Sequence, residues 1–277
     1  MTARAGREAP APWELLQSAR VYDLAQPLEA ATPTSPNHPP FRMALMRRHG
    51  DAVRSDGVSG ANELFTMGGH TGTHIDALCH VAHDMRLHGG VDAAEASRGG
   101  RFQHLGVETI APMVCRGVLL DVPRALGRET LGPGQPVTAA ELELTCREEQ
   151  VDIRPGDAVL VRSGWPVGRY HDAAALIGGA SGVPGPDETA ARWLAERGVR
   201  VTGADTIAYE WLAPDAAASF PAVHRILLVE NGIHIVEVMA LEELASDRVY
   251  EFLFVLAPLK LVGATGSPVR PLAIVCT

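Results

Sequence analysis

The chain has 277 residues, of which 46% are hydrophobic, and its 24 basic and 33 acidic side chains give a formal net charge of −9. This size allows one large core or two small ones. No run of Lys and Arg interleaves with aromatic residues, which argues against nucleic-acid binding because phosphate neutralisation needs clustered positive charge. No segment reaches the length of a membrane span, and residues 1–17 lack the apolar run of a signal peptide. We therefore expect a cytoplasmic protein with no membrane partner.

The four cysteines, Cys79, Cys115, Cys146 and Cys276, are far apart and form neither a CxxC motif nor a disulfide framework. Free thiols in a reducing compartment are the simplest interpretation.

Taken in order, the chain opens with residues 1–20, an Ala/Pro-rich segment that we expect to be loosely ordered apart from a short helix over 13–19. Residues 21–277 show no internal repeat and no linker, which favours a single domain. Its first half predicts strands over 21–28, 41–48 and 62–67, the last one buried, and a helix over 77–85. Its second half predicts strands over 118–122, 156–162, 199–203, 233–238, 249–256 and 272–275, and helices over 138–149, 187–197 and 221–230. Strands that alternate with helices but also follow one another predict an α/β fold with a mixed sheet.

The most informative stretch reads His-Thr-Gly-Thr-His-Ile-Asp-Ala-Leu-Cys-His and places His70, His74, Asp76 and His80 within eleven positions. Imidazole nitrogen and carboxylate oxygen suit a borderline divalent ion such as zinc, manganese or iron(II). Glycines before and inside the stretch allow a tight loop. A helix that begins near Asp76 would place His80 four residues later on the same face, beside the ion without ligating it. Such an ion activates water and polarises a carbonyl, and His80 could carry the proton.

A second block holds His224, expected in the first turn of a helix, and Glu237 on a strand. Val236 and Val238 point to the opposite face, so Glu237 is expected to face a polar cavity. Two other histidines are assigned no role in the site. His38 is expected on the surface, and His234 is expected on the other face of its strand. Asp205 is expected to be a structural hydrogen-bond acceptor.

The stretch from His70 to His80 resembles the H-x-G-T-H-x-D-A-P-x-H signature of the metal-dependent cyclase family, which includes bacterial kynurenine formamidases and isatin hydrolases. Leu78 stands where the family has Pro. The sequence is also similar to the family at 23–28 (DLAQPL), 203–206 (GADT), 224–237 and 263–270 (GATGSPVR).

This resemblance implies a swivelling β/β/α-type fold, with a barrel-like mixed sheet and surrounding helices, in a homodimer or homotetramer. It implies that His70, His74 and Asp76 bind one metal ion, that Asp76 and Glu237 bridge to a second ion held also by His224, and that His80 is the catalytic acid/base. Members similar to isatin hydrolase use the first triad alone, so one or two ions, Zn²⁺ or Mn²⁺, are expected.

The reaction expected from these residues is metal-dependent hydrolysis of a carbon–nitrogen bond in an amide, lactam or formamide. The substrate would be a small, cyclic or aromatic molecule. The alternative is a metal-dependent cyclase, dehydratase or lactone hydrolase of secondary metabolism. The two differ in product mass, because hydrolysis adds one water and a dehydrating cyclisation loses one.

Overall fold

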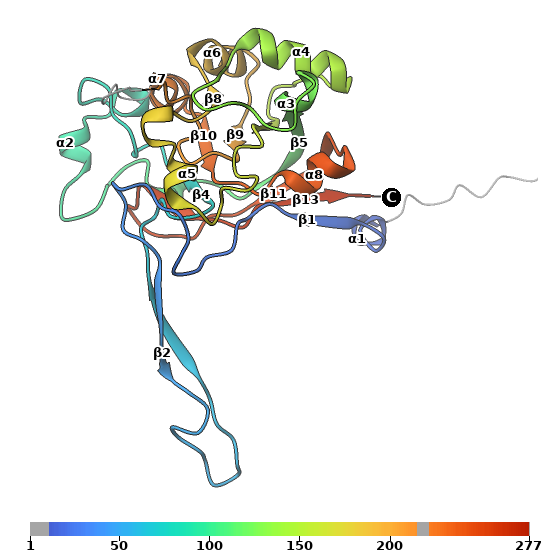
Figure 1. Cartoon of the computed structure of the whole chain (residues 1–277). Helices are drawn as coiled ribbons and strands as arrows, with labels where there is room; N and C mark the ends of the chain where they lie inside the picture. Colours follow the sequence, from blue (N-terminus) through green and yellow to red (C-terminus); the bar gives the residue numbers. More distant parts are fainter. Residues whose placement is uncertain (1–10, 215–221, 277) are drawn as a thin grey trace, which may run out of the picture.

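The computed structural model describes residues 11–214 and 222–276. Within them, a mixed sheet of nine strands runs in the order β1, β13, β11, β5, β7, β9, β10, β4, β12. The sheet curls into a half-barrel, and helices cover it (Figure 1). The predicted α/β fold with a barrel-like mixed sheet and surrounding helices is confirmed.

The bounds of the sheet strands are β1 (Arg20–Asp23), β4 (His74–Asp76), β5 (Met113–Asp121), β7 (Ala158–Arg162), β9 (Val201–Ala204), β10 (His234–Glu237), β11 (Glu251–Leu256), β12 (Gly266–Pro268) and β13 (Leu272–Val275). Two smaller sheets pair β2 (Arg42–Arg47) with β3 (Asn62–Thr66) and β6 (Pro136–Val137) with β8 (Gly185–Pro186). The helices are α1 (Pro12–Leu15), α2 (Ala93–Ala96), α3 (Val122–Ala125), α4 (Ala139–Glu149), α5 (Ala173–Ile177), α6 (Glu188–Glu196), α7 (Ala222–His224) and α8 (Glu242–Asp247). Single-turn helices are η1 (His88–Gly90), η2 (Val107–Thr109) and η3 (Gly179–Ser181), and the π-helix η4 (Arg225–Glu230) continues α7.

The central strands β5, β7, β9 and β10 are parallel and buried on both faces. Leu120 and Val161 face a core shared with α4, α6 and η4, whereas Leu119 and Leu160 face a second core beneath β11. Alternate residues of a strand point to opposite faces, so apolar residues at every position require cover on both sides. This is why the sequence reads as continuous apolar runs there.

Helix α4 has the predicted capping box. The Oγ1 atom of Thr138 accepts from the N–H of Glu141, and the Glu141 carboxylate accepts from the N–H of Thr138. The predicted helix over 221–230 is also present from Ala222 onward, and Pro221 lies outside the described residues. Residues 1–20 were predicted to be loosely ordered. Residues 1–10 lie outside the described part of the chain, and residues 11–20 contain α1 and the first residue of β1. The assignment of 21–277 to one domain stays a prediction.

The helix predicted over 77–85 is absent. The chain instead turns tightly, with the N–H of His80 donating to the carbonyl of Ala77 at 2.9 Å. The N–H groups of Ala77 and Cys79 bond to Thr265 and Leu105, which are distant in sequence. Asp84 and Met85 have φ values of 47° and 58°, outside the helical region. Distant loops have therefore taken the hydrogen bonds that a helix would have used.

The strand predicted to be buried before His70 is also different. Its residues form β3, which is exposed throughout and pairs only with β2 among the described residues. Together they form a hairpin that projects from the body (Figure 1).

Candidate metal centre

Strand β4 places two polar side chains on one face. His74 and Asp76 are two residues apart, so both point the same way from the sheet. Antiparallel pairing sets His74 opposite Glu237 of β10 and Asp76 opposite Gly266 of β12. The loop before β4 turns at Gly72, whose φ of 66° suits glycine. The sheet register therefore brings the early loop and the late strand together.

Five atom pairs define the centre. The Nδ1 atom of His70 and the Nε2 atom of His74 lie 2.8 and 3.6 Å from Oδ1 of Asp76. The Nε2 atom of His224 lies 3.5 Å from Oδ2 of Asp76 and 3.2 Å from Oε1 of Glu237. The Nε2 atom of His74 lies 3.5 Å from Oε2 of Glu237. Bonds of about 2.1 Å to a tetrahedral or octahedral ion separate neighbouring ligand atoms by about 3.0–3.4 Å, which these distances bracket.

The electrostatics of the buried carboxylates also fit a cation. Burial alone would raise the pKa of Asp76, but the imidazoles of His80, His224 and His70 hold it well below 3.8. Burial and the nearby Asp76 carboxylate raise the pKa of Glu237 to about 7. The Oδ2 atom of Asp76 is buried without a hydrogen-bond partner. A buried carboxylate oxygen without a hydrogen-bond partner is costly, and a divalent ion bound among these nitrogen and oxygen atoms would supply the missing partner.

Neighbouring groups orient the three imidazoles. His74 donates from Nδ1 to the carbonyl of Gly72 at 2.8 Å, which leaves the Nε2 lone pair for the centre. The Nε2 atom of His70 lies 2.9 Å from Oγ1 of Thr265, and with Nε2 as the donor the Nδ1 lone pair faces the centre, 2.8 Å from Oδ1 of Asp76. The Nδ1 atom of His224 contacts Oε1 of Glu210, which leaves Nε2. Metal-binding histidines are commonly held in this way.

Glu210 was missed by the sequence reasoning. It is 3% exposed and also accepts from the N–H of Val223 at 3.2 Å. Burial lowers the pKa of His224, but the nearby carboxylates of Asp76, Glu210 and Glu237 raise it well above 6.5 overall. The only sequence signal was proximity to the Gly203–Thr206 motif, which does not indicate where a side chain four residues later will point.

His80 lies over the centre. Its ring stacks on that of His70 with centroids 4.0 Å apart, and it lies 6.2 Å from the His224 ring. Burial lowers its pKa to about 3. Ligand atoms of Asp76, His80 and His224 also lie within 4.8 Å of one another. A turn at Ala77, in place of the predicted helix, delivers His80 to this position.

His38 is not the surface residue that was expected. Its ring stacks on His70 with centroids 5.0 Å apart and lies 6.5 Å from the His80 ring. Burial and His70 lower its pKa. A Pro-rich loop therefore supplies a further imidazole at the rim of the centre. The prolines of this loop predict an extended backbone, but they do not predict which part of the protein the loop packs against.

The structure also shows where His234 and Asp205 lie. The ring of His234 lies outside the set of atom pairs that defines the centre, and its Nδ1 donates to the main-chain carbonyl of Asp76 at 2.9 Å. Asp205 accepts from the main-chain N–H groups of Ser163 and Gly164, as expected of a structural acceptor.

The chain is similar to known proteins over most of its length. The Cyclase family model matches residues 22–211. The chain belongs to the Cyclase family. It is 26% identical over 254 residues to a kynurenine formamidase of Sphingopyxis alaskensis, covering 91% of this chain and 96% of that protein. It is 27% identical over 225 residues to an isatin hydrolase of Roseibium aggregatum, covering 80% and 77%.

Solved structures are similar over nearly the whole chain. A crystal structure of a novel cyclase has a TM-score of 0.83 and 29% identity, covering 94% of this chain and 88% of that one. Isatin hydrolase A from Ralstonia solanacearum has a TM-score of 0.75 and 27% identity, covering 98% and 100%. A structure titled as a potential metal-dependent hydrolase with cyclase activity has 22% identity and a TM-score of 0.60, which supports the fold alone.

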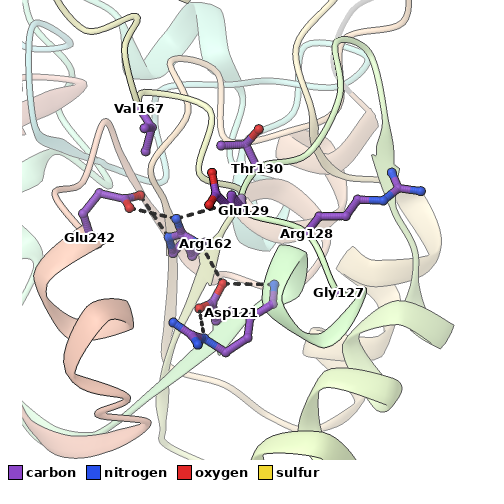
Figure 2. A pocket seen from close by; sticks show the side chains of 9 residues that line it. Asp121, Gly127, Arg128, Glu129, Thr130, Arg162, Val167 and Glu242 are labelled. Atoms are coloured by element: carbon purple, nitrogen blue, oxygen red, sulfur yellow. Dashed lines mark hydrogen bonds and ion pairs between the residues drawn. The ribbon is translucent and has the colours of Figure 1, made fainter.

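A cavity of about 550 Å³ lies away from this centre, at the carboxyl ends of β5 and β7. Arg162 lies between Asp121 and Glu242 in this cavity (Figure 2). Its guanidinium donates to Asp121 at 2.7 Å and makes two hydrogen bonds to Glu242. Arg124 binds the other oxygen of Asp121 at 2.9 Å. These charges neutralise one another, so the cluster joins β5, β7 and α8 and has a structural role.

Proposed function

We propose that this member of the Cyclase family is a metal-dependent hydrolase that cleaves a carbon–nitrogen bond of a small cyclic or aromatic amide, lactam or formamide. The observation that carries the proposal is the orphaned Oδ2 atom of Asp76 inside a buried set of nitrogen and oxygen donors. The similarity to a kynurenine formamidase and to isatin hydrolases supports the bond type.

His70, His74 and Asp76 are the residues we propose for one divalent ion, with His224 and Glu237 completing the set. A second ion would be held by His224 and Glu237, whose Nε2 and Oε1 atoms lie 3.2 Å apart beside Asp76. When bound, Zn²⁺ or Mn²⁺ would supply an activated water and polarise the substrate carbonyl. Proton transfer would be carried out by a side chain of the protein.

His80 is the proposed acid/base. Burial keeps the imidazole neutral at pH 7. The acid/base role rests on the position of its ring beside His70 and His224, from which a ring nitrogen can take a proton during attack on the carbonyl. The protonated ring is then stabilised by the Asp76 carboxylate nearby, and it can return the proton to the leaving nitrogen. The stack on His70 fixes the plane of the ring.

Among the described residues, no helix has the length and apolar character to cross a membrane. We propose that the protein works in the cytoplasm, which is supported by four cysteines that remain thiols.

The experiment is a substrate panel on protein reconstituted with Zn²⁺ or Mn²⁺, using N-formylkynurenine, isatin and an aryl lactone. We expect metal-dependent gain of one water on a C–N substrate, measured by product mass. Loss of one water from a linear substrate would favour the cyclase or dehydratase alternative. Cleavage of the lactone alone would favour a lactonase.

A further inference from the structure

The backbone of the Pro-rich loop is held in place on both sides of His38. On one side, the N–H of His38 donates to the carbonyl of Ser35 at 2.9 Å, which closes a four-residue turn. On the other side, the carbonyl of Pro39 accepts from the N–H of Gly68 at 3.1 Å and from the hydroxyl of Thr71 at 2.8 Å. Gly68 and Thr71 belong to the segment that leads into β4. The loop is therefore attached to the segment that supplies the first metal ligands, and His38 has a defined position beside them.

The ring of His38 lies beside the centre but is not one of its ligands. It stacks on His70 with centroids 5.0 Å apart, and it lies 6.5 Å from the ring of His80 with a tilt of 44°. Its nitrogens belong to neither set of ligand atoms that could hold a metal ion, and they make no hydrogen bond to residues 11–214 or 222–276. The side chain is only partly buried. A polar group that is held in place without a protein partner is suited to orienting a small ligand.

Packing alone does not require an imidazole at this position, because a phenyl ring stacks as well and buries more apolar surface. What the imidazole adds is hydrogen bonding, since in either protonation state it carries at least one N–H donor. Two rings with centroids 6.5 Å apart can both approach one small polar group at ordinary hydrogen-bond distances of about 2.7–3.2 Å. His38 and His80 can therefore contact the same end of a bound molecule.

We propose that His38 is a substrate-binding residue, which donates a hydrogen bond to a second oxygen of the substrate, close to the carbonyl that is attacked. The inference rests on the hydrolase function proposed above. It narrows the substrate to a molecule with a ketone, hydroxyl or carboxylate oxygen beside the bond that is cleaved. His80 then transfers the proton, while His38 fixes the orientation of the substrate. A site built to hydrogen-bond a substrate oxygen discriminates against analogues that lack it.

The test measures ligand binding to the full chain loaded with Zn²⁺ by isothermal titration calorimetry, which does not depend on turnover. The probes are benzohydroxamate and salicylhydroxamate. Both are compact aromatic ligands whose hydroxamate group binds divalent ions, and only salicylhydroxamate has a further oxygen on the neighbouring ring carbon. We expect His38→Phe to weaken salicylhydroxamate binding by about tenfold, the effect of losing one hydrogen bond, and benzohydroxamate binding by less than about twofold.

His38→Gln keeps an N–H donor, so it should recover most of the lost affinity for salicylhydroxamate. His171→Phe is the matched control, because the side chain of His171 is 79% exposed. The Zn²⁺ affinity of His38→Phe should equal that of the wild type, since His38 is not a ligand.

Equal weakening of both probes by His38→Phe would show that the ring only shapes the site, and unchanged binding of both would show that it contacts neither. Either result would overturn the proposal. A Zn²⁺-loaded wild type that binds neither probe would overturn the metal centre together with this inference. Selective loss of salicylhydroxamate in a protein that hydrolyses no C–N substrate would overturn the proposed reaction and still support His38 as an oxygen-binding residue.

Discussion

His74 and Glu237 stand opposite each other on β4 and β10, although they are 163 positions apart in sequence, and Nε2 of His74 lies 3.5 Å from Oε2 of Glu237. Side chains of directly opposed residues lie on the same face of a sheet. The pairing register therefore joins the two blocks of the metal centre.

Glu237→Gln keeps the shape of this side chain and removes its charge. We expect metal affinity to fall by at least about tenfold. Mutation of a residue that only hydrogen-bonds to a metal ligand already lowers metal affinity by about 10–100-fold. Competition with a chromophoric chelator measures the change. Glu243→Gln is the control, since Glu243 has a side chain that is 61% exposed. Unchanged stoichiometry and affinity in Glu237→Gln would remove Glu237 from the centre.

The variants His80→Ala and His74→Ala should differ in metal content. His80→Ala should retain metal and lower turnover by about 10²–10⁴-fold, the usual effect of losing an acid/base group. His74→Ala should lose metal and activity together, because its Nε2 faces both carboxylates. Elemental analysis beside steady-state kinetics separates the two. An empty His80→Ala protein and a full His74→Ala protein would reverse these roles.

Glu210→Gln tests the group that orients His224. The carboxylate contact at Nδ1 keeps Nε2 directed at Asp76 and Glu237. We expect a 10–100-fold weaker metal affinity with the fold intact. Glu196→Gln, at an exposed position of α6, is the matched control. Equal affinities in both variants would show that the contact does not position the ring.

Gly266→Ala should disturb the centre without removing a ligand. A Cβ atom at Gly266 would lie 2.6 Å from Cε1 of His70. The ring must move, at a cost of roughly 1–3 kcal/mol for overpacking. Both thermal stability and metal affinity should fall. Gly60→Ala is the control, because nothing lies within 4 Å of its Cβ position. Full metal affinity in Gly266→Ala would show that the ring can shift without loss.

Glu149 should make stability depend on pH. Burial raises its pKa from 4.5 to about 8, and its Oε2 atom is buried without a hydrogen-bond partner. The folded state thus binds a proton that the unfolded state releases above pH 4.5, so stability is full below that pH and falls as pH rises toward 8. Glu149→Gln should be more stable than wild type by roughly 1–3 kcal/mol at pH 8 and equal to it at pH 4. Urea unfolding at both pH values measures this, and a pH-independent difference would contradict it.

The sequence alone determined the elements whose pattern is local. Continuous apolar runs predicted β5 and β7, and Thr138 with Glu141 predicted the start of α4, because strand burial and helix capping depend on neighbours in the chain. The dense group of His70, His74, Asp76 and His80 likewise indicated a metal centre, since close spacing lowers the entropic cost of assembling a site.

Only the tertiary structure decided how distant groups meet. The turn that carries His80 replaced a helix because its N–H groups bond to residues far along the chain, and no local pattern contains that information. The same holds for Glu210 against His224, for His38 over His70, and for the exposed hairpin whose strand looked buried. Sheet register and loop packing are set by contacts between segments far apart in sequence, and these contacts form the centre.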